Sequence, residues 1–407
     1  MSTFRSIFAI GLIMVMTLTG CMSAEQKTAT AAAQTKAAAT PTPPPTPTPQ
    51  PTTTPPPTFT PTYTPTDTPT PIPTDTPTPI PTREMRSEPK LIPALTASFQ
   101  ELTQLTYLRA LAVSPDGQFL AFATNDIIRL WDLQKNVALQ DRLLSSTVGT
   151  RDLAFTPDSQ MLVSGGLDQK VYVWKVPNIE KIFELDGHQE EIKVVAVSPD
   201  GSMAATGDWK GVIILWDLIG GQEISRPVTS GDHSIEDLDF SPDGKLLAFT
   251  AFYNGVQLWD IAQRKPAGSL NLLSHVYGVV YIAFSPDSNM LAGSTNGLIV
   301  WDIKKLSPLG MTQDIVGGYQ EGVVGYTEIG FSPDGRWIVT SGKGSEIVLF
   351  DAVTRDEVGR LANPGFNSDW VVPYFLPDGR ILANYVAYNV ADNNELGRIV
   401  VWTLGGQ

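Results

Sequence analysis

A motif that recurs seven times constrains the fold of this 407-residue chain more than any other feature of its sequence. The tetrapeptide Ser-Pro-Asp-Gly, or a close variant, returns every 42 to 47 residues, with its prolines at Pro115, Pro157, Pro199, Pro242, Pro286, Pro333 and Pro377. Downstream of each proline an aliphatic run ends in an aromatic residue, at Trp131, Trp174, Trp216, Trp259, Trp301, Phe350 or Trp402. Two markers that keep the same phase through seven copies define a repeated structural unit.

The repeated unit has the pattern of a small antiparallel β-sheet. Large and small residues alternate before each proline, as in Leu111 to Val113, which predicts a strand. Pro-Asp-Gly then makes a tight turn, and two further strands follow, as in Phe119 to Phe122 and Val212 to Trp216. These later strands are apolar on both faces, so each sheet needs a neighbour on either side. We therefore expect an all-β fold, with residues 93–407 forming a single seven-bladed β-propeller of four-stranded antiparallel blades.

The repeats resemble those of the WD-repeat (WD-40) family. Four of the tryptophans are followed directly by aspartate, at Asp132, Asp217, Asp260 and Asp302, and Gly187-His188 stands at the family's glycine–histidine position. The family's blades hold a buried His, Ser/Thr, Asp and Trp tetrad. No unit of this chain combines the His with the Asp, because Lys210 occupies the aspartate position of the third unit. We therefore expect the blades to depend mainly on apolar packing.

The resemblance also implies how the ring closes. The chain stops soon after Trp402, so the seventh sheet lacks an outer strand of its own, and we expect Ala94 to Glu101 to supply it as a clasp. Unit seven is longer than the others between its proline and its aromatic residue, which predicts a loop near Asn389 to Leu396.

The first 20 residues predict a lipoprotein signal peptide. Arg5 precedes an apolar run from Ile7 to Leu18 that is too short to cross a bilayer comfortably. Leu18-Thr19-Gly20-Cys21 resembles a bacterial lipobox, in which the cysteine is lipidated and becomes the new N-terminus. Cys21 is the only cysteine, so we expect an exported protein whose lipid anchors it to the bacterial cell membrane, facing outside the cytoplasm. The alternative is an ordinary signal peptide with an incidental cysteine.

Residues 21–92 predict a disordered linker, first rich in Ala and Thr and then, from Pro41 to Thr82, almost wholly Pro and Thr. Proline favours extended polyproline II without internal hydrogen bonds, so this segment is typical of a semi-rigid stalk. O-glycosylation of its threonines and a role as a ligand for aromatic grooves remain alternatives.

Composition excludes several classes of function. A net charge of −14 argues against binding to nucleic acid. One cysteine and three histidines leave little room for metal or cofactor chemistry, and no nucleophile elbow or phosphate-binding loop is present. The repeated Pro-Asp-Gly aspartates are interpreted as turn formers. We expect neither metal, nor cofactor, nor catalysis.

The remaining candidate for a functional site is one rim of the ring. The resemblance places there the starts of the first strands and the hairpins between second and third strands. The candidate partner-binding residues on this rim are Arg109, Arg151, Lys193, Trp209, Glu236, Tyr253 and Glu328. Exposed aromatics beside charges are favourable anchors at interfaces. The alternative is that these are ordinary solvated loop residues.

The function predicted from these features is a monomeric scaffold or recognition platform that binds other proteins at the cell surface. A carbohydrate- or envelope-binding lectin is the second hypothesis, and a propeller hydrolase or oxidoreductase is the third. Fold alone does not separate them.

Overall fold

The computed structural model describes residues 97–106, 108–124, 127–143, 149–227, 233–251, 255–270, 279, 281–294, 297–313, 328–342, 344–366, 368, 370–389 and 394–404. The predicted signal peptide with Cys21, the linker and Tyr253 lie outside these residues. All the regular elements described are strands. Within this described part of the chain, no helix has the length and apolar character needed to span a bilayer.

The described strands form seven four-stranded antiparallel sheets, each ordered from its innermost strand outward. Blades 1 to 4 are β2 (Ala110–Val113), β3 (Phe119–Ala123), β4 (Ile127–Asp132), β5 (Val137–Leu143); β6 (Thr150–Phe155), β7 (Met161–Gly166), β8 (Lys170–Lys175), β9 (Glu180–Asp186); β10 (Ile192–Val197), β11 (Met203–Asp208), β12 (Ile213–Asp217), β13 (Gln222–Ser225); and β14 (Ile235–Phe240), β15 (Leu246–Ala251), β16 (Val256–Asp260), β17 (Lys265–Leu270). Blades 5 to 7 are β18 (Ile282–Phe284), β19 (Met290–Ser294), β20 (Gly297–Asp302), β21 (Ser307–Gln313); β22 (Ile329–Phe331), β23 (Trp337–Ser341), β24 (Ile347–Asp351), β25 (Glu357–Leu361); and β26 (Trp370–Phe375), β27 (Ile381–Asn389), β28 (Asn394–Leu404), β1 (Ala97–Thr106).

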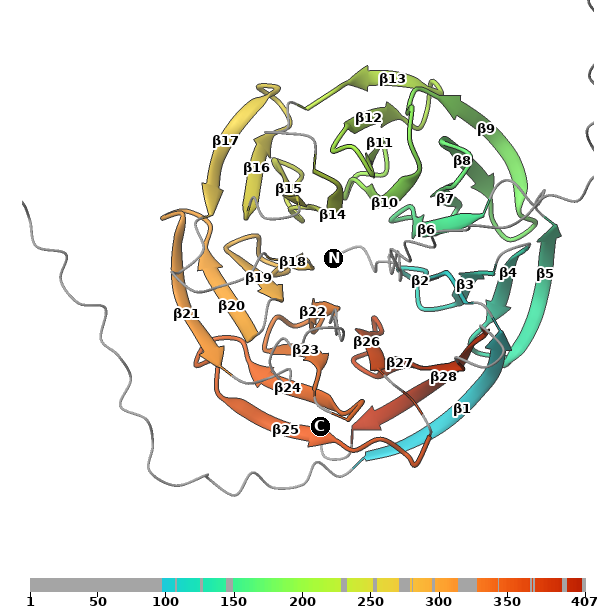
Figure 1. Ribbon diagram of the computed structural model, residues 1–407, viewed down its shortest axis with the longest axis vertical. Coiled ribbons are helices and arrows are strands. Elements are labelled where there is room, and N and C mark those ends of the chain that lie inside the picture. Colours follow the sequence, from blue (N-terminus) through green and yellow to red (C-terminus); the bar gives the residue numbers. More distant parts are fainter. Residues whose placement is uncertain are drawn as a thin grey trace, which may run out of the picture. The chain divides into compact units, whose positions relative to one another are not determined.

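The seven sheets close into a ring, with each first strand on the inside and each fourth strand on the outside (Figure 1). The predicted fold class, a single seven-bladed β-propeller, is confirmed. The clasp is confirmed as well, because β1 pairs with β28 in antiparallel register, with Ala97 opposite Leu404 and Phe99 opposite Trp402. The strand extends to Thr106, beyond the predicted end at Glu101, and residues 94–96 lie outside the described residues. The predicted loop from Asn389 to Leu396 is wrong at both ends, since Asn389 belongs to β27 and Asn394 to Leu396 belong to β28, and residues 390–393 lie outside the described residues.

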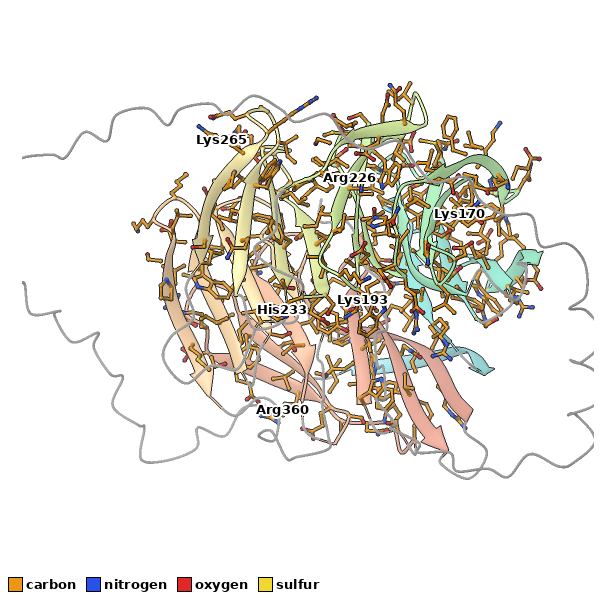
Figure 2. The ribbon with its side chains drawn as sticks, turned by 45° about the horizontal axis from the view of Figure 1, so that its top comes forward. Lys170, Lys193, Arg226, His233, Lys265 and Arg360 are labelled. Carbon is orange, nitrogen blue, oxygen red and sulfur yellow. The ribbon has the colours of Figure 1, made fainter. Side chains whose placement is uncertain are left out.

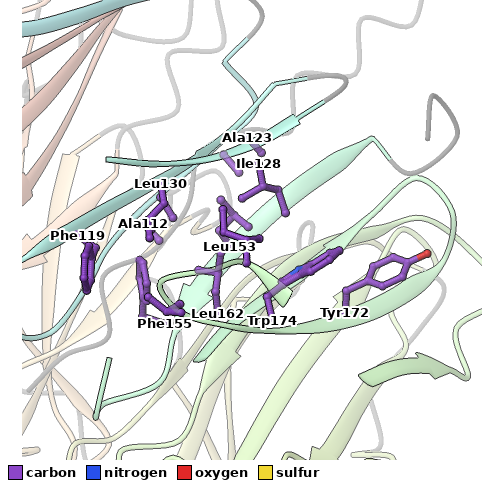
Figure 3. Close-up of a cluster of buried hydrophobic side chains, with 14 residues drawn as sticks. Ala112, Phe119, Ala123, Ile128, Leu130, Leu153, Phe155, Leu162, Tyr172 and Trp174 are labelled. Carbon is purple, nitrogen blue, oxygen red and sulfur yellow. The ribbon is translucent and has the colours of Figure 1, made fainter. Parts of the chain in front are cut away.

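Apolar side chains of neighbouring blades meet between the sheets. In the cluster between blades 1 and 2, Ala112 and Leu130 of blade 1 pack with Leu153, Phe155 and Trp174 of blade 2 (Figure 3). Full burial of a large side chain of this kind stabilises the fold by about 1.5–3 kcal/mol. Each blade contributes to two such interfaces, which is why its inner strands are apolar on both faces.

The Ser-Pro-Asp-Gly turns hold themselves together through side chains. In the first turn, Ser114 Oγ donates to Asp116 Oδ1 over 2.5 Å and accepts the backbone N–H of Phe119 over 2.8 Å. The same bond from a Ser or Thr hydroxyl to the turn aspartate recurs in blades 2 to 6. These repeated aspartates are turn formers, as interpreted from the sequence.

Adjacent turns also contact one another at their fourth position, which has positive φ. Glycine takes this conformation without strain in five blades, for example Gly117 with φ of 70°. Blades 2 and 5 have Ser159 and Ser288 there instead, with φ of 61° and 62°. Their hydroxyls accept the backbone N–H groups of Asp116 and Asp243 in the preceding blade, at 3.2 and 3.0 Å. At these two positions the positive φ of serine costs backbone strain, and the hydrogen bond to the preceding blade offsets that cost.

The aspartate of each Trp-Asp pair shapes the turn between the third and fourth strands. Asp217 Oδ1 accepts the N–H groups of Ile219 and Gly220 at 2.9 and 3.0 Å. Asp132 makes the equivalent paired bonds in blade 1, and so does Asp351, which follows Phe350, in blade 6. This pair therefore combines a core aromatic with a turn former.

A buried hydrogen-bond tetrad is present in blade 3, so the expectation that no blade combines His and Asp is wrong. Trp216 Nε1 donates to Thr206 Oγ1 over 2.8 Å, and Thr206 Oγ1 lies 2.7 Å from His188 Nε2. His188 Nδ1 lies 2.8 Å from Asp208 Oδ2. Asp208 stands two positions before Lys210, and the hairpin turn brings its carboxylate back to the imidazole. The aspartate was missed because it was expected at the position of Lys210, at a fixed spacing from Trp216.

Deleting residues 92–102 should lower the melting temperature by about 10 °C or more, because the outer edge of blade 7 loses its partner strand. Thermal unfolding followed by circular dichroism measures this. Deleting residues 61–71 of the Pro/Thr segment removes the same length of chain and should leave the melting temperature unchanged. Equal melting of both deletion variants and the full chain would contradict a closing role for β1.

Replacing Thr206 with Val should reduce the free energy of unfolding by about 2 kcal/mol, because the buried Trp216 N–H and His188 Nε2 both lose their partner. Thr340→Val in blade 6 is the matched control, since the closing aromatic there is Phe350, which has no N–H group. Urea unfolding measures both variants. Similar losses in the two would mean that the tetrad adds nothing specific.

Candidate interaction site at the channel mouth

The first strands of all blades begin at one end of the ring, which we call the mouth, and the hairpin between β11 and β12 of blade 3 lies at the same end. Trp209, in the turn between β11 and β12, donates its backbone N–H to the carbonyl of Glu191 over 3.1 Å. Glu191 directly precedes β10, so this bond holds the indole beside the start of the innermost strand.

Lys193 forms a buried ion pair between blades 3 and 4. Its Nζ lies 2.7 Å from Glu236 Oε1, and the two side chains are 3% and 8% exposed. Ser234 also donates its hydroxyl to Glu236. The ammonium group lies 4.2 Å from the centre of the Trp209 ring, within the range of a cation–π interaction. Figure 2 shows Lys193 near the middle of the ring, whereas Lys265 lies at its periphery.

Burial and charge act against each other on this lysine. Burial lowers the pKa of Lys193, while the carboxylate of Glu236 raises it and the charge of Arg151 lowers it again. The pKa therefore lies below the ordinary lysine value. Because the group keeps Glu236 and the indole as partners, its position is fixed by blade 3 and blade 4 together.

Arg151 provides a second ion pair at the mouth, between blades 2 and 3. Its Nη2 lies 3.3 Å from Glu191 Oε2, and its side chain is 18% exposed. We refer to Arg151, Glu191, Lys193, Trp209 and Glu236 as the mouth cluster. The cluster combines two cations, two anions and one half-buried indole across three adjacent blades.

The predicted rim residues are less exposed than the sequence analysis assumed. Lys193 and Glu328 are buried, at 6% and 5% exposure, and Arg109 and Arg151 are half-buried. The reason is geometric, because the start of an inner strand lies between the loops of two neighbouring blades. Whether these residues bind a partner stays a prediction, and Tyr253 lies outside the described residues.

Buried carboxylates below the mouth link neighbouring inner strands. Asp152 Oδ2 accepts the N–H of Val195 in the next blade over 2.6 Å. Asp237 and Asp239 in blade 4 accept the N–H groups of Ile282 and Phe284 in blade 5, at 2.8 and 2.7 Å. An inner strand has one edge without a strand partner, and these carboxylates satisfy its N–H groups.

Sequence reasoning missed most of these carboxylates, although the repeat alignment contains a signal. The position five residues before the turn proline is Ala110, Asp152, Val194, Asp237, Tyr281, Glu328 and Val372 in successive units. An acidic residue or tyrosine at four of seven equivalent inner-strand positions is unusual for a strand that is otherwise apolar. Comparing units position by position would have found it.

The described residues offer no site for a metal ion, since no three His, Cys, Asp or Glu side chains among them are placed to bind one together.

The ion pair between Lys193 and Glu236 predicts non-additive effects on stability. Lys193→Met should reduce the free energy of unfolding by about 3 kcal/mol, because it leaves Glu236 buried without its cation. Adding Glu236→Gln should recover most of that loss. Urea unfolding of the two single variants and the double variant forms a thermodynamic cycle, and a double variant as unstable as the sum of the singles would exclude the coupling.

Comparison with protein-family models identifies the WD40 repeat (WD domain, G-beta repeat) at residues 100–132, 143–175, 179–217, 225–260, 267–302 and 315–351. Strands β26 to β28 of blade 7 lie after the last matched stretch, whereas its outer strand β1 overlaps the first, and the structure establishes the blade.

Similar curated proteins come from several eukaryotes. WD repeat-containing protein SL1-17 of Schistosoma mansoni is 29% identical over 211 residues, 51% of this chain and 65% of that protein. Small ribosomal subunit protein RACK1y of Oryza sativa subsp. japonica is 32% identical over 154 residues, 36% of this chain and 45% of that protein. Protein HIR1 of Kluyveromyces lactis is 25% identical over 294 residues, 58% of this chain and 33% of that protein. The matches thus span between one third and just under two thirds of these relatives. The matched repeats, together with the closed ring of blades, show that the chain belongs to the WD40 repeat family.

Proposed function

We propose that this protein is a non-catalytic, monomeric propeller that binds other proteins at the mouth cluster while a lipid on Cys21 anchors it outside the cytoplasmic membrane of a bacterium. The observation that carries the binding proposal is the placement of Trp209. Its ring is fixed over Lys193 at 4.2 Å and stays half-buried at the mouth. A rigid, partly exposed aromatic flanked by oriented charges is the arrangement typical of an interface anchor.

The charges of the mouth cluster favour a protein partner, which has charges of both signs, over a partner with charges of a single sign. Arg151 and Lys193 are balanced by Glu191 and Glu236, so the cluster has both signs at fixed positions. Such a pattern favours a polar partner in one orientation. The net charge of −14 makes a nucleic acid an unsuitable partner.

The sequence of residues 1–21 and the Pro/Thr segment support the proposed lipid anchor and export. The relatives come from eukaryotes and do not bear on either. A lipid on Cys21 and a stalk of some seventy residues would display the propeller at a distance from the membrane.

Crosslinking on intact cells tests the proposal. The double variant Trp209→Ala/Arg151→Ala should lose the partners captured by the unmodified protein, because the anchor and one of its two cations are gone. Ile219→Ala/Lys265→Ala is the matched control, as it also removes one large apolar side chain and one cation but at exposed turn and outer-strand positions.

Two outcomes would contradict the proposal. Partners that are unchanged in the mouth variant would show that the mouth cluster is not the binding surface. Membrane retention of Cys21→Ser, in fractionated cells, would show that the lipid is not the anchor.

A lectin is the second candidate, because a half-buried indole also stacks on sugar rings. A glycan array comparing the unmodified protein with Trp209→Ala separates the two functions. Glycans retained by the unmodified protein and lost in the variant would favour the lectin.

A further inference from the structure

The closing strand β1 runs from the end of the ring opposite the mouth, which we call the far end, up to the mouth. First strands begin at the mouth, and β26, β27 and β28 of blade 7 alternate in direction, so β28 ends at Leu404 at the far end. Because β1 pairs antiparallel with β28, Ala97 also lies at the far end, beside Leu404. Thr106, at the other end of β1, lies at the mouth. The chain that precedes β1 in sequence therefore enters the ring at the end opposite the mouth cluster.

The direction of a pull decides how strongly β1 resists it. The hydrogen bonds of an antiparallel pair are perpendicular to the strands. A force along β1 loads all its bonds to β28 at the same time, which is a shear geometry. A force that pulls the neighbouring ends Ala97 and Leu404 apart breaks the bonds one pair after another. The pairing spans the whole of β1, so rupture in shear needs the larger force.

A bulge in β1 also opposes sliding of the two strands. The register shifts between Glu101 and Thr103, so β1 has one residue more than β28 over this stretch. Moving β1 along β28 would shift the bulge to residues that pair without one. The register is therefore fixed along the direction of the strand.

Leu108 holds the mouth end of the same strand. It follows β1 by two residues, and its side chain is 2% exposed. It packs in the cluster between blades 7 and 1, together with Leu111 and Val372. A displacement of β1 toward the far end would have to pull this side chain out of the core.

The connection from β1 to β2 is short. Residues 107–109 join the two strands, whereas the other outer strands reach the next inner strand over longer segments, from residues 187–191 to residues 314–328. Each residue of an extended chain spans at most about 3.6 Å, so this connection has little slack. A pull on β1 therefore acts directly on the innermost strand of blade 1.

We propose that β1 transmits tension between the anchor and a partner bound at the mouth cluster, and that the ring stays closed because this tension loads β1 against β28 in shear. The inference rests on the proposed function, in which the stalk enters at β1 and the partner binds at the mouth. Figure 1 shows β1 pointing toward blade 1, on the side of the ring where blades 2 to 4 also lie. A line from Ala97 to the mouth cluster therefore lies largely along the strand.

Stretching single molecules of the unlipidated full chain in optical tweezers tests the inference, with the thiol of Cys21 as one attachment point. Gln189→Cys gives a second, exposed attachment point at the mouth in blade 3, which loads β1 in shear. Thr403→Cys gives one opposite Ser98 at the far end, which unzips the same two strands. We expect the first unfolding event to need about twofold more force with Gln189→Cys. Equal forces, or a lower force with Gln189→Cys, would overturn the inference.

A substitution at Leu108 locates the resistance in the clasp. Leu108→Ala should lower the force of the first event by about a third in the Gln189→Cys chain, because β1 loses the side chain that holds its mouth end. Leu153→Ala is the matched control, since Leu153 is also fully buried but lies between blades 1 and 2. It should reduce stability in urea to a similar extent and leave the force unchanged. An unchanged force in Leu108→Ala, or an equal loss of force in both variants, would overturn the inference.

The force measurement and the crosslinking fail separately. The tweezers pull at position 189 and not through a partner, so their result does not depend on the mouth cluster. Unchanged partners in the mouth variant would overturn the docking surface alone. Equal forces in the two pulling geometries would overturn the role of the clasp alone.

Discussion

The structure depends on one constraint, which is that each blade is a thin sheet with two apolar faces. Neither face can remain in water, so each blade needs a neighbour on both sides. A linear stack of such sheets always ends in two uncovered faces, whereas a ring has none. The contacts of Leu111 and Leu120 in blade 1 with Val372 and Leu382 in blade 7 are where the first sheet meets the last.

The sequence was sufficient to predict the number of blades, their strands and the closure by β1. The number of blades and their strands depend on apolar pattern and turn residues that recur in every unit, whereas the closure by β1 was implied by the family resemblance. The tetrad was missed because it depends on where a hairpin places Asp208 in space, two positions from the expected one. Local pattern does not contain that information.

The candidate site stays a prediction, and the structure shows only how its residues are arranged. The starts of the inner strands have charged side chains, as the sequence indicates, but the pairing of Lys193 with Glu236 joins residues of two blades. Such a contact follows from the rotation between neighbouring sheets, which a single sequence does not specify. The same is true of Asp152, whose partner is a backbone N–H in the next blade. The polar side chains of the innermost strands therefore find their partners in the neighbouring blade rather than in their own.

The pairing of the first described strand with the last has a consequence for how such a chain is made. A ribosome synthesises β1 before the other described strands and its partner β28 after all of them. Six blades can collapse while the ring is still open, with an unpaired strand edge at one end. The ring therefore stays incomplete until β28 has been synthesised, so the closed fold forms through a contact between the two described strands that are furthest apart in the chain.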